Sequence, residues 1–150
     1  MIQPGAPAPD FTLHDQDLEK VSLADFAGGR VILCFYPGDF SPVCSDQLSL
    51  YQEVLGEIRA QGAELVGISV DSPFVHRAFR EQLGLEMRLL SDFHPKGEVS
   101  SAYGAYRADR GFDSRSLVLV GPDGRVEWSH ASPSDVEIPG ANLIFDALSR

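Results

Sequence analysis

Residues 31–44 read VILCFYPGDFSPVC, and this stretch decides the fold class. The first six residues, Val31 to Tyr36, are apolar throughout, which is typical of a strand buried on both faces of a parallel sheet. A short loop follows. Apolar residues then recur three or four positions apart, at Leu48, Tyr51, Leu55 and Ile58. That spacing predicts an amphipathic helix over residues 41–61 that stops at Gly62. A buried strand that leads into a long helix indicates an α/β fold.

The rest of the chain alternates between strands and helices in the same way. We expect a hairpin of strands 11–14 and 21–23, a capped helical turn at 22–26, strands at 65–70 and 87–90, helices at 72–83, 99–106 and 143–148, and a second hairpin of strands 117–120 and 125–129. This order predicts a layered α/β sheet with a parallel centre and an antiparallel edge. No linker or repeat divides the chain, so we expect residues 1–150 to form a single domain.

Composition limits the partners and the compartment. The chain has 22 acidic and 12 basic residues and a formal net charge of −10, which disfavours nucleic acid and anionic lipid as partners. The longest strictly apolar run has six residues, whereas a membrane-spanning helix needs roughly 20. The first ten residues lack the basic and apolar regions of a secretory signal. Two cysteines do not make a disulfide scaffold, so we expect a cytoplasmic, reducing location.

Cys44 stands in the first turn of the predicted helix, just after a buried strand has ended. The free N–H groups of a helix start carry positive partial charge, so a thiol there loses its proton more readily and becomes a nucleophile. Ser41 is placed to cap the helix and to hold its hydroxyl near the sulfur. Pro42 suits the first helical turn, and Pro37 can limit the access of water from the other side. The alternative is that Cys44 is one more small buried residue.

The residues around Cys44 resemble those of the peroxiredoxins, thiol peroxidases of the thioredoxin-like fold. The family pattern Pro-x-x-x-Thr/Ser-x-x-Cys is matched by Pro37, Ser41 and Cys44, and the distant family arginine is matched by Arg115 in RSLVLVGPDG. The segments GAPAPDFTL (5–13) and LSDFHPKG (90–97) are also similar, the second most of all to the one-cysteine alkyl hydroperoxide reductase E group and next to the bacterioferritin comigratory protein group. The resemblance spans nearly the whole chain. It implies a central mixed β-sheet flanked by helices, with an N-terminal β-hairpin.

The resemblance also implies roles for individual residues. Cys44 would attack the peroxide and become a sulfenic acid. Full ionisation of a thiol raises its rate only roughly 30-fold at neutral pH, so donors that bind the transition state must supply the rest. Arg115, Ser41 and the N–H groups near Val43 and Cys44 would be those donors. Gln47 matches a position that braces the arginine. From the residues alone, a solvated Arg115 and an exposed Gln47 remain alternatives.

Two departures from the family pattern concern Ser41 and the resolving cysteine. Most members carry Thr where this chain has Ser41, whose hydroxyl lacks the methyl group that fixes it. Ser49 stands where many bacterioferritin comigratory proteins have the resolving cysteine, and no cysteine follows Cys44. We therefore expect an external thiol reductant: thioredoxin, a glutaredoxin-like protein or a low-molecular-weight thiol. Cys34 lies mid-strand and is expected to be a packing residue. The alternative is a disulfide partner for Cys44, which requires Cα atoms within about 7 Å.

The remaining features add no second site. The histidines, His14, His76, His94 and His130, show no metal-ligand spacing, and we expect no metal, flavin or haem. His94 alone lies in a segment similar to the family. The absence of Cys-x-x-Cys argues against a thioredoxin-type dithiol oxidoreductase. A redox sensor or holdase that uses the sulfenic acid as a signal would have almost the same sequence. Close relatives form dimers, so we expect a homodimer that acts on peroxide.

Overall fold

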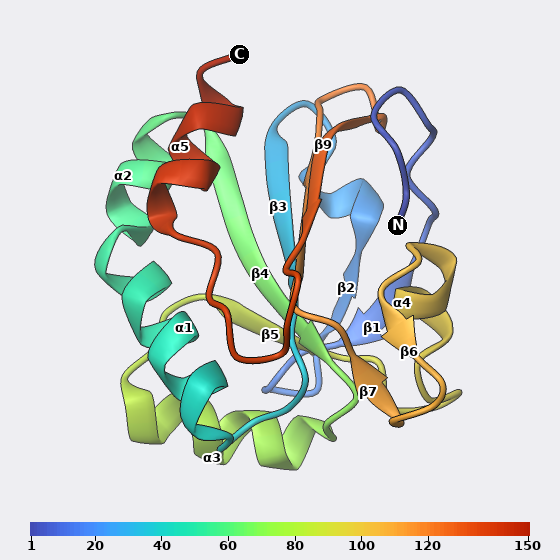
Figure 1. The fold of residues 1–150 in the computed structure, drawn as a ribbon, viewed down its shortest axis with the longest axis vertical. Coiled ribbons are helices and arrows are strands. Elements are labelled where there is room, and N and C mark those ends of the chain that lie inside the picture. Colours follow the sequence, from blue (N-terminus) through green and yellow to red (C-terminus); the bar gives the residue numbers. More distant parts are fainter.

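The computed structural model describes residues 1–150 as one seven-stranded mixed sheet, a two-stranded sheet and the helices that cover them (Figure 1). The large sheet has the order β2-β1-β5-β4-β3-β8-β9. Its strands are β1 (Thr12–His14), β2 (Lys20–Ser22), β3 (Arg30–Phe35), β4 (Ala63–Ser69), β5 (Arg88–Ser91), β8 (Ser116–Val120) and β9 (Val126–Ala131). The small sheet pairs β6 (Tyr106–Arg107) with β7 (Phe112–Asp113).

Five α-helices and one 3₁₀ turn accompany the strands. They are η1 (Leu23–Phe26), α1 (Pro42–Glu53), α2 (Leu55–Ala60), α3 (Pro73–Leu83), α4 (Glu98–Ala102) and α5 (Ala141–Leu148). None of the helices combines the length and the apolar character needed to cross a bilayer. The predicted turn at 22–26 is confirmed: the Ser22 N–H donates to the Asp25 carboxylate at 2.9 Å, one half of a capping box.

The parallel centre of the sheet is confirmed, because β3, β4 and β5 pair in parallel. The prediction of one antiparallel edge is incomplete. Strands β8 and β9 add antiparallel strands on one side, and the N-terminal hairpin adds β1 and β2 antiparallel on the other. Only the His14–Ser91 register joins the hairpin to β5, and no local pattern in either segment encodes that contact.

The core has two layers, one on each face of the sheet. Along β3 and the residue after it, Ile32, Cys34 and Tyr36 face the layer beneath α1, α2, α3 and α5, whereas Val31, Leu33 and Phe35 face the other layer. Figure 1 shows α1, α2 and α5 on one side of the sheet and α4 with the β6–β7 hairpin on the other. Both faces of β3 are thus buried, as its unbroken apolar run predicts.

Two predicted helices differ from those observed. The helix expected over 41–61 is divided at Val54, whose backbone leaves the helical region (φ −108°, ψ 5°). Val54 and Gly56 are both weak helix formers, and the apolar face continues across the break. The helix expected over 99–106 ends at Ala102, and Tyr106 lies in β6 instead. Gly104 adopts a left-handed φ of 77°, which a helix cannot include.

Candidate active site

Helix α1 begins at a capped turn that places Cys44 third in the helix. Ser41 has extended backbone angles, and its hydroxyl oxygen accepts a hydrogen bond from the Cys44 N–H at 3.2 Å. Pro42 occupies the first helical position, where its missing N–H costs nothing. Phe40, just before the cap, has a positive φ of 68°, a conformation that costs a side-chain-bearing residue roughly 1–2 kcal/mol. The surrounding loop must therefore hold this turn in place.

The sheet register carries Arg115 to the same place. Ser116 pairs with Phe35, because β8 runs antiparallel to β3. Arg115 therefore lies beside the end of β3, where the loop to α1 begins. Its Nη1 donates to the Cys44 sulfur at 3.4 Å, although the two residues are 71 positions apart. The sulfur itself has no exposed surface.

Arg115 is held from two directions. Its Nη1 also donates to Gln47 Oε1 at 2.5 Å, and its Nε and Nη2 donate to the Asp135 carbonyl at 3.1 and 2.6 Å. Arg115 is only 2% exposed and Gln47 is fully buried, so the alternatives of a solvated arginine and an exposed glutamine are wrong. Because a guanidinium has five N–H donors, one N–H on Nη2 is left for a ligand.

The first turn of α1 contributes fewer amide donors than we expected. The Cys44 N–H is taken up by the Ser41 hydroxyl, so it is not available to a bound molecule. Pro42 has no N–H, which leaves the Val43 N–H as a free donor of this turn. The Ser41 hydroxyl accepts through its oxygen, and its proton can still be donated. The donors left free at this site are therefore an N–H of Arg115, the Ser41 hydroxyl and the Val43 N–H.

A cavity of about 340 Å³ opens beside these groups. Its lining consists of Pro37, Gly38, Asp39, Ser41, Pro42, Val43, Phe112, Arg115 and Asp135. Pro37 and Phe112 supply apolar parts of this lining. Cys44 lies beneath this lining, and Arg115 both faces the cavity and contacts the sulfur. The volume is at the lower end of the range for small-molecule sites.

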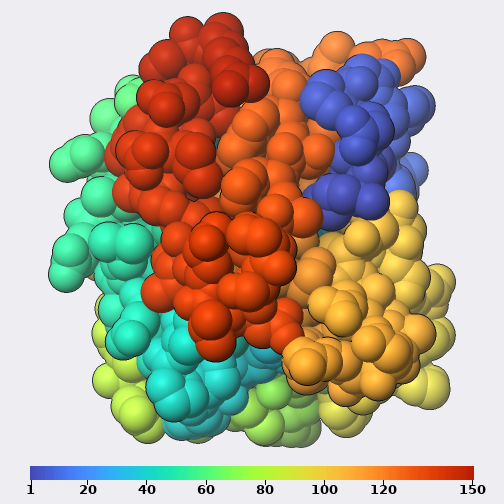
Figure 2. All heavy atoms as spheres, in the orientation of Figure 1, coloured from blue at the N-terminus to red at the C-terminus, as the bar shows by residue number.

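Segment 132–140, after β9, crosses the face of the molecule and supplies one wall of this site. Figure 2 shows this orange-red segment on the surface between α1 and the β6–β7 hairpin. The Asp135 carbonyl binds Arg115, and its carboxylate pairs with Arg110. Tyr51 on α1 donates to the Pro139 carbonyl at 2.7 Å. The sequence offered no signal for this contribution, because backbone carbonyls leave no mark in a residue pattern.

Cys34 lies in a different environment from Cys44. It pairs with Gly67 and Leu117 in the middle of the sheet and has no exposed surface. Its sulfur receives only the Gln47 Nε2 at 3.7 Å. Burial raises the pKa of the Cys34 thiol to about 12, an effect that nearby Arg115 only partly offsets. Cys34 is therefore a protonated packing residue in the reduced protein.

Of the four histidines, only His76 is fully buried. It contacts Asp39, a pairing that the sequence did not suggest. Donor atoms of Asp39, Asp71 and His76 lie within 4.8 Å of one another, but they are already engaged in hydrogen bonds within the protein. His94, which lies in the segment similar to the family, is exposed and lines a separate hollow with Asp10.

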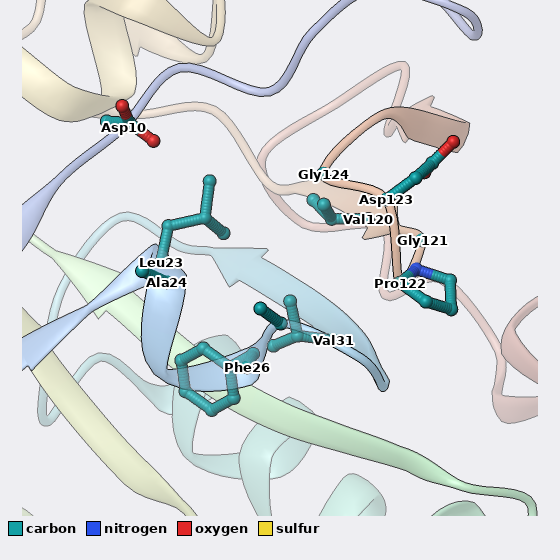
Figure 3. Close-up of a pocket in the computed structure, with 11 residues that line it drawn as sticks. Asp10, Leu23, Ala24, Phe26, Val31, Val120, Gly121, Pro122, Asp123 and Gly124 are labelled. Atoms are coloured by element: carbon teal, nitrogen blue, oxygen red, sulfur yellow. The ribbon is translucent and has the colours of Figure 1, made fainter.

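Another cavity, of about 200 Å³, lies at the opposite end of β3 (Figure 3). Apolar side chains line much of it, among them Leu23, Phe26, Val31 and Val120. Its only ionisable side chains are the carboxylates of Asp10 and Asp123, and it contains no cysteine, histidine or arginine. It therefore lacks the thiol that the site at Cys44 contains.

Comparison with known proteins identifies the family to which this fold and site belong. The model of the AhpC/TSA family matches residues 4–129. The chain belongs to this family. This chain, a peroxiredoxin, is 34% identical over 150 residues to alkyl hydroperoxide reductase E of Mycobacterium tuberculosis. The match covers 99% of this chain and 97% of that protein. The predicted resemblance is thereby confirmed.

Solved structures agree with the fold of this peroxiredoxin. It superimposes on AhpC of Enterococcus faecalis with a TM-score of 0.89 at 26% identity, covering 99% of this chain and 92% of the other. For the peroxidoxin BcpB of Mycobacterium tuberculosis the TM-score is 0.85 at 25% identity, covering 99% and 96%. The thioredoxin-like fold is confirmed. The protein is a thiol-dependent peroxidase, an oxidoreductase that acts on peroxides.

Proposed function

We propose that Cys44 is the peroxidatic nucleophile of this enzyme. The observation that carries the proposal is the 3.4 Å contact between Arg115 Nη1 and the Cys44 sulfur, beside the cavity. The thiolate attacks one oxygen of the peroxide, an S–O bond forms and the O–O bond breaks. The departing oxygen takes a proton and leaves as water or an alcohol. Cys44 is left as a sulfenic acid.

The donors around the cavity suit the charge that develops in this reaction. Negative charge builds on both oxygens as the O–O bond lengthens. The free Nη2 N–H of Arg115, the Val43 N–H and the Ser41 hydroxyl can donate to those oxygens. Gln47 and the Asp135 carbonyl fix the guanidinium, so that it needs no reorganisation during the reaction. Because ionisation gains only roughly 30-fold, these donors supply most of the acceleration.

The cavity supports both hydrogen peroxide and organic hydroperoxides as substrates in antioxidant defence. At about 340 Å³ it exceeds the needs of hydrogen peroxide. The apolar walls of Pro37, Pro42, Val43 and Phe112 suit an alkyl group attached to the peroxide oxygen.

Regeneration of Cys44 is proposed to require an external thiol: thioredoxin, a glutaredoxin-like protein or a low-molecular-weight thiol. Cys34 is sealed in the sheet and holds its proton, so it is a poor internal partner for the sulfenic acid. One equivalent of peroxide should leave Cys44 reactive toward dimedone, and excess peroxide should convert it to the sulfinic acid. A dominant Cys34–Cys44 peptide in non-reducing maps of the monomer would contradict the external route.

The protein is proposed to act as a homodimer. Three aromatic side chains are exposed: Phe40 (46%) before α1, Phe74 (72%) in α3 and Phe93 (54%) after β5. Aromatic side chains are enriched at protein–protein interfaces, and these three suit contact with a second copy. Light scattering should give the dimer mass, and Phe74→Asp should shift it toward the monomer; a monomeric wild type would contradict the proposal.

The cytoplasm is the proposed location, since both cysteines are free thiols and the cycle needs a supply of reductant. The experiment that tests the proposed function is stopped-flow peroxide reduction by the reduced enzyme, followed by turnover with each class of thiol reductant. Rapid consumption of one equivalent and sustained turnover with one class are expected. Oxidation without turnover by any reductant would instead support a redox sensor.

A further inference from the structure

A buried His–Asp pair lies next to the active-site loop and takes no part in the chemistry described above. His76 is in the first turn of α3, and Asp39 is in the loop between β3 and α1. Both side chains have no exposed surface, and His76 Nδ1 lies 2.6 Å from Asp39 Oδ2. His76 Nε2 lies 3.0 Å from the Leu90 carbonyl oxygen. Both ring nitrogens therefore lie within hydrogen-bond distance of an acceptor on another element.

Asp39 is also tied to two other elements. Its second carboxylate oxygen accepts from the Tyr36 hydroxyl at 2.6 Å, and its N–H donates to the Asp71 carboxylate at 2.8 Å. Asp71 is itself held by the Ser69 hydroxyl at 2.6 Å. Burial raises the pKa of Tyr36 well above its ordinary value, so that hydroxyl stays a donor. The loop is thus attached to the ends of β3 and β4 and to α3.

These hydrogen bonds hold the part of the loop whose backbone conformation is otherwise unfavourable. Phe40 follows Asp39 directly and has a positive φ of 68°. Such a conformation persists only where the surroundings fix it. The next residue is Ser41, which caps α1 and binds the Cys44 N–H. A displacement at Asp39 would therefore move the Ser41 hydroxyl and the start of the helix that carries Cys44.

We propose that Asp39 and His76 are positioning residues for the peroxidase reaction: the buried pair fixes the Pro37–Ser41 loop, so that Ser41 and Cys44 meet the peroxide held by Arg115. The inference rests on the proposed function of Cys44. The side chains of the pair have no exposed surface and no hydrogen bond to the sulfur, so the pair acts through the backbone of residues 39–41, of which Asp39 and Ser41 line the cavity. Because His76 belongs to α3, the pair also links this helix to the loop.

The test compares two reactions of Cys44 in the same variants. Reaction with peroxide needs the whole constellation of donors, whereas alkylation by iodoacetamide needs only an accessible thiolate. His76→Ala should lower the second-order rate constant for hydrogen peroxide about 10- to 100-fold, as misplacement of reacting groups does. The alkylation rate should not fall. Asp39→Ala should give a similar loss, Asp39→Asn a smaller one, and the double alanine variant no more than either single variant.

Ser72→Ala is the matched control. It removes the side-chain cap of the same helix, in which the Ser72 hydroxyl accepts from the Val75 N–H, and keeps the backbone bond from the His76 N–H to the Ser72 carbonyl. It should lower thermal stability and leave the peroxide rate constant within twofold of wild type. An equal loss of peroxide reactivity in Ser72→Ala would assign a merely stabilising role to His76. An unchanged peroxide rate in His76→Ala would also overturn the proposal.

Tyr36→Phe provides the test if His76→Ala does not fold. It deletes a single hydroxyl that holds Asp39 and should reduce the peroxide rate constant about 3- to 10-fold without slowing alkylation. An unaltered peroxide rate there would contradict the proposal. The wild-type rate constant, measured in the same series, tests the peroxidase function separately. A wild type that is alkylated but does not consume peroxide would refute that function. The ratio of each variant's rate constant to that of wild type tests the positioning role.

Discussion

The two cysteines of this peroxiredoxin are ten residues apart and equally buried, yet their surroundings differ completely. Cys44 lies at a helix start, with the Arg115 guanidinium 3.4 Å from its sulfur and a cavity beside it. Cys34 lies in the middle of β3, between β4 and β8, and only the Gln47 amide reaches its sulfur. Burial therefore does not distinguish the two thiols; the cation at 3.4 Å and the adjacent cavity do.

Exchange of each sulfur for oxygen is the sharpest test of this difference. Cys44→Ser should abolish peroxide consumption, because a serine hydroxyl stays protonated and is a far weaker nucleophile. Cys34→Ser should largely preserve it, because that sulfur takes no part in the reaction. The measurement is peroxide consumption with a thiol reductant in excess. Comparable losses in the two variants would remove the distinction between the two regions.

Removal of the Arg115 guanidinium should leave the Cys44 sulfur, like that of Cys34, without a cation in contact with it. We expect Arg115→Ala to lower the second-order rate constant for peroxide by ~10²–10³, the usual cost of one lost transition-state donor. Arg115→Lys should rescue poorly, because lysine lacks the planar fork that binds Gln47 and Asp135 together. Stopped-flow rates across pH provide the check. If alkaline pH fully restored the rate, Arg115 would only favour the thiolate.

Gln47 joins the two regions, since its oxygen binds Arg115 and its nitrogen reaches Cys34. Gln47→Ala should lower the peroxide rate constant about tenfold, because the guanidinium loses one of its two supports. The exposed neighbour Asp46 offers a matched control, and Asp46→Ala should leave the rate unchanged. Equal rates in the two variants would show that the Asp135 carbonyl alone positions Arg115.

Asp113 extends the comparison to a buried acid without a partner. Neither of its carboxylate oxygens has a hydrogen bond. Burial raises the pKa of Asp113 to about 7. The charges of Asp92 and Asp71 add to this rise, and the nearby Ser100 hydroxyl only partly offsets it. The folded state therefore binds more protons than the unfolded state between about pH 4 and 7. Stability contributed by the neutral form is present below that range and is lost as the pH rises through it.

Asp113→Asn should remove this pH dependence. The variant should match wild type near pH 4 and exceed it at pH 8 by up to about 4 kcal/mol in the free energy of unfolding. Urea unfolding at both pH values measures the difference, with the exposed Asp109→Asn as control. If the difference in free energy of unfolding between variant and wild type does not grow from pH 4 to pH 8, other groups stabilise the ionised Asp113 in the folded state.

Much of the fold could be predicted from local patterns. The apolar run at 31–36 identified the central strand, and the spacing from Leu48 to Ile58 identified the buried face of α1 and α2. The division at Val54 and the strand at Tyr106 escaped prediction, because continuous periodicity does not reveal where a backbone turns. The site was predictable where it is local, at Pro37, Ser41 and Cys44. Arg115 and Gln47 needed the family resemblance.

The sequence by itself determined most of the elements, the buried strand before the helix, and the thiol at the helix start, since these depend on neighbours within one or two turns. Only the tertiary structure decided what surrounds that thiol. The pairing of Ser116 with Phe35 brings Arg115 to the sulfur, the Asp135 carbonyl holds the guanidinium, and His76 reaches Asp39. Such contacts join residues 20 to 81 positions apart. Strand register and packing set them, and these follow from the burial of the whole core rather than from any local pattern.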